Sequence, residues 1–310
     1  MRILVTGGAG FIGSNVADAF LAAGHEVAVV DNLSSGDRAN VPRAAKFYEM
    51  DIADPRLDSV FADFKPEALN HHAAQISVPL SVDHPGEDAR TNVMGWINLL
   101  DGCRKHGVKR VIYVSSGGVV YGEPSQLPAD ETFPIQPASP YGISKSAGEW
   151  YLKFYAAQTR LTYVAFRYSN VYGPRQMPHG EAGVVSIFIQ ALLAGKTPTI
   201  FGDGSVVRDY VFVGDVVDAN LKALEHGDNV ALNIGTGVPT TVNQLYEAIK
   251  ASLASPIDAL HGPPRRGDLQ ANYLNARLAE KVLGWKPKTS LAEGIAKTRD
   301  YFQQRAKSNP

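Results

Sequence analysis

The chain opens with a short apolar segment, Ile3–Thr6, that runs directly into three glycines, Gly7, Gly10 and Gly13. Each glycine suits one task where a strand turns into a helix. The first allows a tight turn, the second lets the backbone approach a pyrophosphate, and the third lets the helix lie close to the strand. The N-terminus of that helix offers free N–H groups and a partial positive charge to an anion. This unit predicts a doubly wound, Rossmann-type parallel sheet that binds a dinucleotide.

Strand-like apolar runs alternate with amphipathic helix-like segments through the first half of the chain, which is typical of βαβ units and an α/β fold. The expected strands are Ile3–Thr6, Glu26–Asp31, Phe47–Asp51, Ala68–His72, Val111–Ser115 and Thr162–Arg167. The expected helices are Phe11–Ala23, Arg56–Phe64, Glu87–Lys105 and Tyr141–Ala157.

The pattern loosens after residue 170, and 310 residues exceed the size at which a single core usually stops growing. We therefore expect a dinucleotide-binding domain over residues 1–168 and a smaller, interleaved α/β substrate domain mainly over 169–310. Residues 205–238 are expected to return to the first domain. The later expected elements are a loop at Tyr172–Gly180, strands at Thr197–Phe201 and Ala231–Ile234, and helices at Gly183–Ala194, Gly214–Glu225, Thr241–Leu253, Ala276–Leu283 and Leu291–Arg305.

The composition argues against several classes of partner. The net charge is −1, and no basic stretch marks a nucleic-acid or membrane surface. No segment approaches the roughly 20 apolar residues that span a bilayer, and the N-terminus lacks a secretory pattern. The single cysteine, Cys103, predicts neither a disulfide nor a metal site. We expect a cytoplasmic enzyme that acts on a small molecule, without a metal.

Asp31 ends the second expected strand, 18 residues after Gly13. A carboxylate there can accept hydrogen bonds from both ribose hydroxyls of an adenosine, whereas a 2′-phosphate would meet a like charge. The sequence therefore predicts NAD rather than NADP. Asp51 and Ile52, at the end of the third strand, are placed to meet the adenine.

Tyr141 and Lys145 are four residues apart, behind a helix start at Ser139-Pro140. Residues at this spacing share one helix face. A free phenol titrates near pH 10, and a neighbouring ammonium together with a positive nicotinamide would favour its ionised form. We therefore expect a lowered pKa that makes Tyr141 a base at neutral pH. The strand that carries Ser115 and Ser116 lies upstream and can supply a hydroxyl.

An ordered set of motifs gives the chain a resemblance that covers almost its whole length. These are TGGAGFIGSNV from Thr6, VVDNLSSG to Gly36, HHAAQ to Gln75, TNVMG to Gly95, SSGGVVYG at Ser115–Gly122, SPYGISK at Ser139–Lys145, RYSNVYGPRQ at Arg167–Gln176, HGEAGVV at His179–Val185, VRDYVFVGDV at Val207–Val216 and PRRGDL at Pro264–Leu269. The sequence resembles the extended short-chain dehydrogenases/reductases, and most of all the NAD-dependent UDP-glucose (UDP-galactose) 4-epimerases.

The resemblance implies roles for individual residues. Tyr141 would take the proton of the sugar 4′-hydroxyl while the C4 hydride passes to NAD, and Lys145 would hold the nicotinamide ribose. Besides the three glycines, Tyr141 and Lys145, the implied cofactor contacts are Phe11, Ile12, Asp31, Asn32, Ser35, Gly36, Asp51, Ile52, Ala73, Ala74, Gln75, Asn92 and Tyr168. The implied UDP-sugar contacts, besides Ser116 and Tyr141, are Asn170, Val185, Arg208, Arg265 and Asp268. Guanidinium groups independently suit pyrophosphate oxygens, although an isolated Arg208-Asp209 pair would more often be a surface ion pair.

The chain departs from this family at one position. The family usually places the catalytic Ser or Thr four residues before the Tyr of its VYG segment, and Gly117 stands there. Ser116 is the best substitute, and Ser115 is a weaker one. The following residues, Gly117 to Val120, include no carboxylate of the kind that related dehydratases and decarboxylases carry, which favours plain epimerisation. A non-catalytic NAD-sensing protein is an alternative from another class.

Two further expectations come from the resemblance. The first is a homodimer in which helices 87–105 and 141–157 pack as a four-helix bundle. The second concerns Asn272, which stands at the position that limits the room beside the 2-substituent of the sugar, and its intermediate size leaves N-acetylated substrates open. Trp96 and Trp150 lie on the two long helices, and we expect both to be packing residues.

Overall fold

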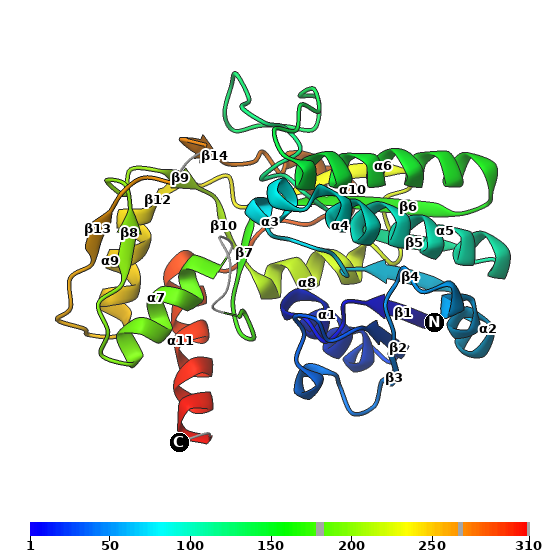
Figure 1. Ribbon diagram of the computed structural model, residues 1–310, viewed down its shortest axis with the longest axis horizontal. Helices are drawn as coiled ribbons and strands as arrows, with labels where there is room; N and C mark the ends of the chain where they lie inside the picture. Colours follow the sequence, from blue (N-terminus) through cyan, green and yellow to red (C-terminus); the bar gives the residue numbers. More distant parts are fainter. Residues whose placement is uncertain (178–182, 266–268, 309–310) are drawn as a thin grey trace.

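A seven-stranded parallel sheet forms the centre of the protein (Figure 1). The computed structural model describes residues 1–177, 183–265 and 269–308. The strand order is β11-β6-β5-β4-β1-β2-β3. The strands are β1 (Arg2–Thr6), β2 (Glu26–Asp31), β3 (Lys46–Glu49), β4 (Ala68–His71), β5 (Arg110–Ser116), β6 (Thr162–Tyr168) and β11 (Val230–Ile234). The predicted α/β class with a doubly wound parallel sheet is confirmed.

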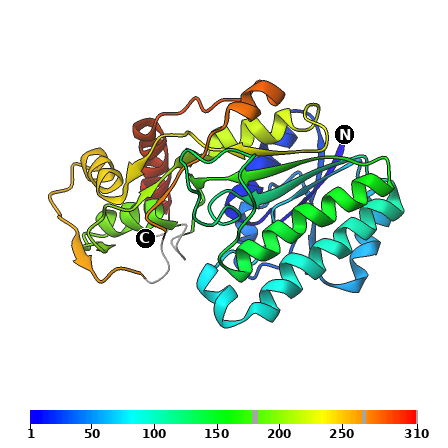
Figure 2. The ribbon, with the colours of Figure 1, turned by 90° about the horizontal axis from the view of Figure 1, so that it is seen from above.

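Helices cover both faces of this sheet, as Figures 1 and 2 show. One face carries α1 (Phe11–Ala22) and α8 (Val213–Lys222), and the other carries α2 (Asp58–Phe64), α5 (Gly95–His106) and α6 (Pro140–Gln158). Along β1, Ile3 and Val5 pack toward the first layer, while Leu4 packs toward the second. Burial on both faces explains why these strands read as continuous apolar runs rather than alternating ones.

The order of the strands reverses between β1 and β4. In open sheets of this kind the crevice beyond the carboxyl ends of the strands, at such a switch point, is where ligands bind. The glycine turn follows β1 and residues 72–75 follow β4, so the fold brings these two predicted cofactor segments together.

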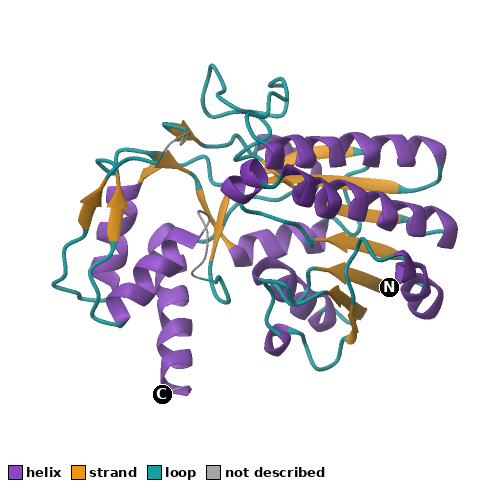
Figure 3. Cartoon of the chain, viewed as in Figure 1, coloured by secondary structure: helices purple, strands orange, loops and turns teal. Residues whose placement is uncertain are grey.

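A smaller region lies beside the carboxyl edge of the sheet (Figures 2 and 3). Its helices are α7 (Val184–Leu193), α9 (Val242–Ser252) and α11 (Leu291–Ser308), whereas α10 (Arg277–Leu283) packs against β11 at the edge of the large sheet (Figure 1). Short strands pair there as β7 (Asn170–Tyr172) with β10 (Tyr210–Phe212), β8 (Thr199–Phe201) with β13 (Leu260–Gly262), and β9 (Val207–Arg208) with β12 (Thr240–Thr241) and β14 (Ala271–Asn272).

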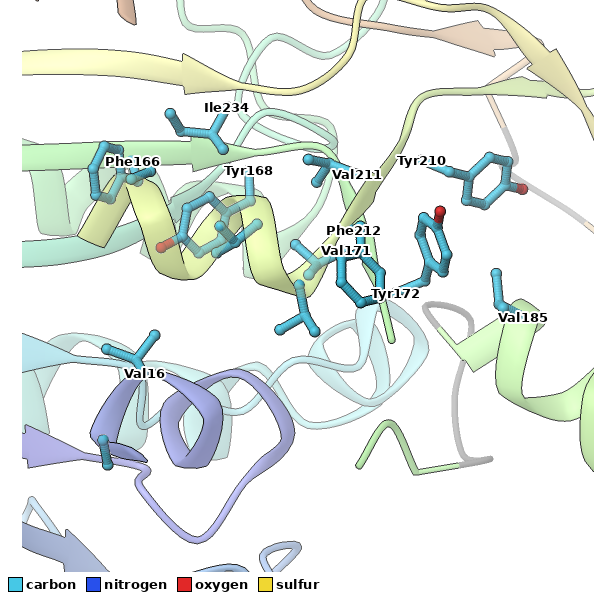
Figure 4. Packing of buried hydrophobic residues seen from close by; sticks show 14 of the residues in the cluster. Val16, Phe166, Tyr168, Val171, Tyr172, Val185, Tyr210, Val211, Phe212 and Ile234 are labelled. Atoms are coloured by element: carbon cyan, nitrogen blue, oxygen red, sulfur yellow. The ribbon is translucent and has the colours of Figure 1, made fainter. Parts of the chain in front are cut away.

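The chain passes between the two regions more than once. Within the segment 205–238, α8 and β11 join the large sheet, whereas β9 pairs inside the smaller region. One cluster of buried side chains runs without a break from Val16 on α1, past Tyr168, to Val185 on α7 (Figure 4). The two regions therefore share a core.

The expected long helix 87–105 is interrupted. The chain forms α3 (Val78–Asp83), which the sequence did not predict, then α4 (Pro85–Ala89), a π-helical turn at Arg90–Met94, and only then α5. Most other elements differ from expectation by one to three residues, and β3 ends at Glu49, two residues before Asp51. In the part of the chain that the structure describes, no helix has the length and apolar character needed to cross a bilayer.

Candidate active site

The glycine turn after β1 leaves room that a side chain would fill. Gly7 has φ +69°, and a Cβ on it would lie 2.5 Å from the backbone nitrogen of Ala73. A Cβ on Gly13 would lie 2.3 Å from the carbonyl oxygen of Gly7. Helix α1 begins at Phe11 with no side-chain cap and no acidic residue in its first turn. Its N–H groups and positive dipole end are thus available to an anion, and this geometry fits a dinucleotide pyrophosphate.

Asp31 joins this turn to the loop after β2. Its side chain is only 8% exposed; Oδ2 accepts from the backbone N–H of Ala9 at 3.0 Å and Oδ1 from that of Leu33 at 2.8 Å. A carboxylate offers about four lone-pair sites, so about two remain for further donors. On the same loop Ser35 is exposed, and Gly36 packs so closely on Ala9 that a Cβ would lie 2.8 Å from the Ala9 Cβ.

The loop after β3 meets the loop after β2. Asn32 Nδ2 donates to Asp51 Oδ2 at 3.3 Å, and Asp51 Oδ1 accepts from the backbone N–H of Ala53 at 2.7 Å. Ile52 is buried and faces Gly95, where a Cβ would lie 2.7 Å from Ile52 Cγ1. The predicted adenosine-side residues therefore lie along one stretch of the sheet edge.

The π-helical turn presents Asn92 to the segment after β4. Asn92 Oδ1 accepts from the backbone N–H of Gln75 and Nδ2 donates to the Gln75 carbonyl, both at 2.9 Å. Nδ2 also reaches Ser144 Oγ on α6, at 3.2 Å. Ala73 and Ala74 are thereby held between the glycine turn and an anchored Gln75. This task explains the interrupted helix, since π turns commonly mark functional sites.

Helix α6 carries the candidate catalytic pair. Ser139 caps it by accepting from the Gly142 N–H at 3.1 Å, and Pro140 occupies its first turn. The helix lies flat against β5 because Gly148 has no side chain: a Cβ there would be 1.9 Å from Tyr113 Oη. Lys145 is buried and its Nζ donates to the carbonyl of Val114 on β5 at 2.8 Å.

The two serines at the end of β5 face different partners. Ser115 Oγ donates to Glu149 Oε1 at 2.5 Å, so its hydroxyl is committed to α6. Ser116 lies beside the phenol of Tyr141, and its hydroxyl acts to lower the pKa of that phenol. Adjacent strand residues point to opposite faces, which accounts for the difference. The structure thus brings Ser116, Tyr141 and Lys145 together and directs Ser115 elsewhere.

Burial dominates the titration of the pair. It raises the pKa of Tyr141 well above its ordinary value, although the hydrogen bond with Ser116 acts in the opposite direction. Burial also lowers the pKa of Lys145 to about 8, while Asp88 acts to raise it. Lys145 Nζ lies 5.9 Å from the centre of the Tyr141 ring. Burial, which sequence reasoning did not weigh, acts against the expected lowering of the Tyr141 pKa, and the lowering beside a positive nicotinamide stays a prediction.

Tyr168 ends β6 beside Ser116 in the register of the sheet. Its ring is buried and points toward α8 (Figure 4), where its hydroxyl accepts from Asn220 Nδ2 at 2.7 Å. The remaining face of the sheet edge near the glycine turn is thereby closed by an aromatic ring.

The candidate UDP-sugar residues are spread over the smaller region. Asn170 begins β7, Val185 is buried on α7, and Arg208 lies on β9, where its guanidinium donates to the carbonyls of Val207 and Leu269 at 2.9 and 2.8 Å. The Arg265 guanidinium stacks 4.3 Å above the centre of the Phe201 ring. The last candidate, Asp268, lies outside the described residues.

Asp209 behaves differently from the expected surface ion pair. It is fully buried, and its carboxylate accepts from the N–H groups of Thr236, Gly237 and Leu274 at 2.8, 3.0 and 3.3 Å. Arg208 donates to carbonyls instead. The surface-pair interpretation is therefore wrong, because the carboxylate finds backbone donors inside the fold.

Two features escaped the sequence analysis. The first is Phe201, a half-exposed aromatic side chain beside Arg265. It lies directly before GDGSVV, in a stretch without a recognised motif, so the sequence did not indicate a role for it. Glu149 and Arg167 form a buried ion pair at 2.6 Å behind the catalytic helix. Glu149 stands four residues after Lys145, so the helical spacing could have indicated a shared face.

Over residues 1–177, 183–265 and 269–308, no three His, Cys, Asp or Glu side chains gather as a metal ion would need. Cys103 is buried, and burial raises the pKa of its thiol, as a structural rather than a reactive cysteine requires.

Comparison with known proteins places the chain in a family. The model of the NAD dependent epimerase/dehydratase family matches residues 3–235. A UDP-glucose 4-epimerase of Mycolicibacterium smegmatis is 49% identical over 99% of this chain and 100% of its own length. The UDP-glucose 4-epimerase of Thermotoga maritima, solved with UDP-glucose, is 50% identical over 99% of this chain and 100% of that one, with a TM-score of 0.97. The UDP-glucose 4-epimerase of Thermus thermophilus, solved with NAD, is 44% identical over 98% and 99%, with a TM-score of 0.94.

The family model covers most of the chain, and the relatives span almost all of it at high identity. The chain belongs to the NAD dependent epimerase/dehydratase family, within the extended short-chain dehydrogenases/reductases.

Proposed function

We propose that this protein interconverts UDP-glucose and UDP-galactose by oxidising C4 of the sugar and reducing the resulting ketone from its other face. The observation that carries the proposal is the grouping of Tyr141, Ser116 and Lys145 at the carboxyl edge of the sheet, beside the glycine turn. The turn after Ser116 contributes no carboxylate to this grouping. Such an arrangement can move one proton and hold one hydride acceptor, and epimerisation needs nothing more.

In this proposal Tyr141 takes the proton of the 4′-hydroxyl as the general base. Ser116 hydrogen-bonds the same sugar oxygen and the phenol, so that it guides the proton between them. NAD supplies a nicotinamide that accepts the C4 hydride and returns it. Lys145 orients the nicotinamide ribose and contributes positive charge near the phenol. Because burial raises the pKa of Tyr141, this positive charge is needed to form the phenolate.

Residues around the sheet edge are assigned to the cofactor. Gly7, Gly10, Gly13, Phe11 and Ile12 receive the pyrophosphate. The adenosine side is assigned to Asp31, Asn32, Ser35, Gly36, Asp51 and Ile52, and the nicotinamide side to Ala73, Ala74, Gln75, Asn92 and Tyr168. Residues 1–168 together with α8 and β11 form the proposed NAD domain, and the rest of 169–310 forms the proposed UDP-sugar domain.

The proposed role of Asp31 predicts a change of cofactor preference. In Asp31→Ala the acceptor for the ribose hydroxyls and the like charge that repels a 2′-phosphate both disappear. We expect NAD affinity to fall about tenfold or more and the ratio of NAD to NADP affinity to fall further. Titration of cofactor-stripped protein with each dinucleotide measures both. Unchanged selectivity would remove Asp31 from this role.

The proposed substrate contacts are Asn170, Val185, Arg208, Arg265 and Asp268. The support among the described residues is a pair of guanidinium groups in a smaller region next to the catalytic edge, and guanidinium forks suit diphosphate oxygens. The exposed ring of Phe201 beside Arg265 offers a flat surface for a nucleobase.

The direct test is an assay of purified protein with UDP-glucose. Formation of UDP-galactose until the two sugars reach a fixed ratio supports the epimerase. Bound NAD without product would support the NAD-sensing alternative, and a dehydrated or decarboxylated product would support the related enzymes. Comparing UDP-glucose with UDP-N-acetylglucosamine addresses the 2-substituent. Asn272 near that position is buried and its amide is bound to the turn after Ser116, which favours the smaller sugar.

We also propose that two copies associate through α5 and α6. Trp150, expected to be a packing residue, is 60% exposed in the single chain, and Ile143 and Phe154 are exposed on the same helix. Met94, next to the start of α5, is exposed as well. A second copy of these two helices would cover this apolar surface as a four-helix bundle.

The proposed interface predicts a change of mass. Trp150→Glu places a charge in the centre of the apolar surface, where it would be desolvated without a partner. We expect the wild type to sediment as a dimer at micromolar concentration and the variant to dissociate at least about tenfold more readily. The exposed Val238→Glu, far from α6 in the fold, serves as control. A wild type that sediments as a monomer would reject the dimer.

We place the enzyme in the cytoplasm, in sugar-nucleotide (galactose) metabolism. Two features support this setting: the single cysteine is buried and unpaired, and the net charge of −1 comes without a basic stretch.

A further inference from the structure

Position 117 is glycine for a reason that lies elsewhere in the chain. A Cβ built on Gly117 would lie 2.5 Å from Leu274 Cδ1 and 3.0 Å from Leu274 Cδ2. Carbon atoms do not approach that closely without displacement, since the optimum separation is about 3.5–4.0 Å. Leu274 is fully buried in a small cluster with Val120, Tyr121 and Ala129. Its side chain therefore fills the space that any side chain at position 117 would need.

Leu274 is itself firmly held. Its backbone N–H donates to Asp209 Oδ2 at 3.3 Å, and the same buried carboxylate binds Thr236 and Gly237. Two residues earlier, Asn272 Nδ2 donates to the carbonyl of Gly117 at 3.3 Å. Asn272 Nδ2 also reaches the carbonyl of Gly118 at 3.5 Å, so the segment 272–274 contacts the turn through these hydrogen bonds and through the packing of Leu274.

The turn also has backbone hydrogen bonds of its own, because the carbonyl of Ser116 accepts from the N–H groups of Val119 and Val120 at 3.3 and 3.1 Å. The parallel pairing of β5 with β6 ends at Ser116, and beyond it the Gly117 N–H donates to the carbonyl of Tyr168 at 2.9 Å. Two successive glycines bring no side chains for packing and the largest backbone freedom of any residue. The backbone hydrogen bonds set the path of the chain, and Leu274 supplies the side-chain packing that the two glycines lack.

We propose that Leu274 is a positioning residue for catalysis: by packing on Gly117 it holds the turn that orients the Ser116 hydroxyl toward Tyr141, and it confines the hydroxyl-bearing side chain to position 116. The proposal rests on the proposed function for the role of Ser116. The steric exclusion between positions 117 and 274 stands without it, and the test separates the two.

The test is a double-variant cycle of Gly117→Ala, Leu274→Ala and the pair, measured by turnover and by thermal unfolding. Gly117→Ala alone forces a clash, and we expect kcat to fall about tenfold or more, because small misplacements of reacting groups are costly. Leu274→Ala alone releases the turn, and we expect a similar loss in kcat with KM changed less than about threefold. In the Leu274→Ala background only the tight contact of the new Cβ with the carbonyl oxygen of Arg167, at 3.2 Å, remains, so Gly117→Ala should cost much less than in the wild type, about threefold or less.

The pH profile distinguishes positioning from simple loss of packing. The hydrogen bond with Ser116 favours the ionised phenol and so lowers the pKa of Tyr141. A turn that has lost its support weakens this bond, the pKa rises, and the acid side of the kcat profile moves to higher pH. Leu127→Ala is the matched control, since Leu127 packs on the same cluster and a Cβ on Gly117 would not meet it. It should leave both kcat and the profile within about twofold of wild type.

Two results would overturn the inference. The first is a kcat of the double variant that equals the product of the two separate fold-losses, and the second is a Leu274→Ala enzyme with wild-type kcat and pH profile. Thermal unfolding provides the readout if neither the wild type nor any variant shows epimerase activity. If the melting temperature also falls in Gly117→Ala and the second substitution removes that effect, the steric exclusion holds and the proposed function fails. If the melting temperatures are additive, the inference fails by itself.

Discussion

The Tyr141→Phe variant is expected to bind NAD and fold as the wild type does, while its turnover falls by about two orders of magnitude or more. Removal of a general base typically costs about 10²–10⁴ in rate. The change deletes one oxygen from a half-buried ring, and the backbone N–H of Tyr141, which donates to Ser81 Oγ at 3.1 Å, is untouched. Turnover of UDP-glucose and the absorbance of bound NAD measure the two effects.

The control for this variant is Tyr151→Phe, which deletes the same atom from the partly exposed ring on the same helix. It should retain full activity. Near-normal turnover of Tyr141→Phe would exclude the phenol from proton transfer, whereas loss of both NAD and activity would point to a damaged fold. Only a loss of turnover with retained NAD assigns the base.

The sequence was most informative where function depends on local spacing. The glycines at 7, 10 and 13, the carboxylate ending β2 and the Tyr141–Lys145 pair on one helix face each lie within a short stretch of chain, so elementary geometry was enough to predict their structural setting. The same is true of the alternating strands and helices, whose order fixes a parallel sheet.

Long-range packing could not be predicted in this way. The π-helical turn exists because Asn92 binds the backbone of Gln75, and Gly117 is glycine because of Leu274. Trp150 looked like a core residue and lies on the surface. In each case the deciding partner comes from another part of the chain, and hydrophobic periodicity carries no information about it. The burial that raises the pKa of Tyr141 likewise depends on the whole fold.

The ion pair behind the catalytic helix makes the second large prediction. Arg167 and Glu149 have side chains that are only 6% and 10% exposed, and they form two parallel hydrogen bonds of 3.0 and 2.6 Å. Glu149 also accepts from Ser115, and Arg167 donates to Tyr121 Oη at 2.9 Å. Burial alone would lower the pKa of Arg167, but the bonds and charge of Glu149 outweigh it and raise the pKa. The pair therefore ties α6 to β5 and β6 under the catalytic groups.

Glu149→Gln keeps the shape of the side chain and removes its charge, which leaves the guanidinium buried without a counter-charge. Breaking a buried pair in this way costs about 3–5 kcal/mol, whereas replacing both partners by apolar residues is often close to neutral. We expect Glu149→Gln to lower the unfolding free energy by that amount in a urea titration, and Glu149→Met with Arg167→Met to recover part of it. The control is Asp63→Asn, which breaks the exposed pair with Lys46 and should leave stability at the wild-type value. If Glu149→Gln and Asp63→Asn have the same unfolding free energy, the buried pair does not hold α6 to the sheet. The placement of Tyr141 and Lys145 must then depend on the apolar packing of that helix alone.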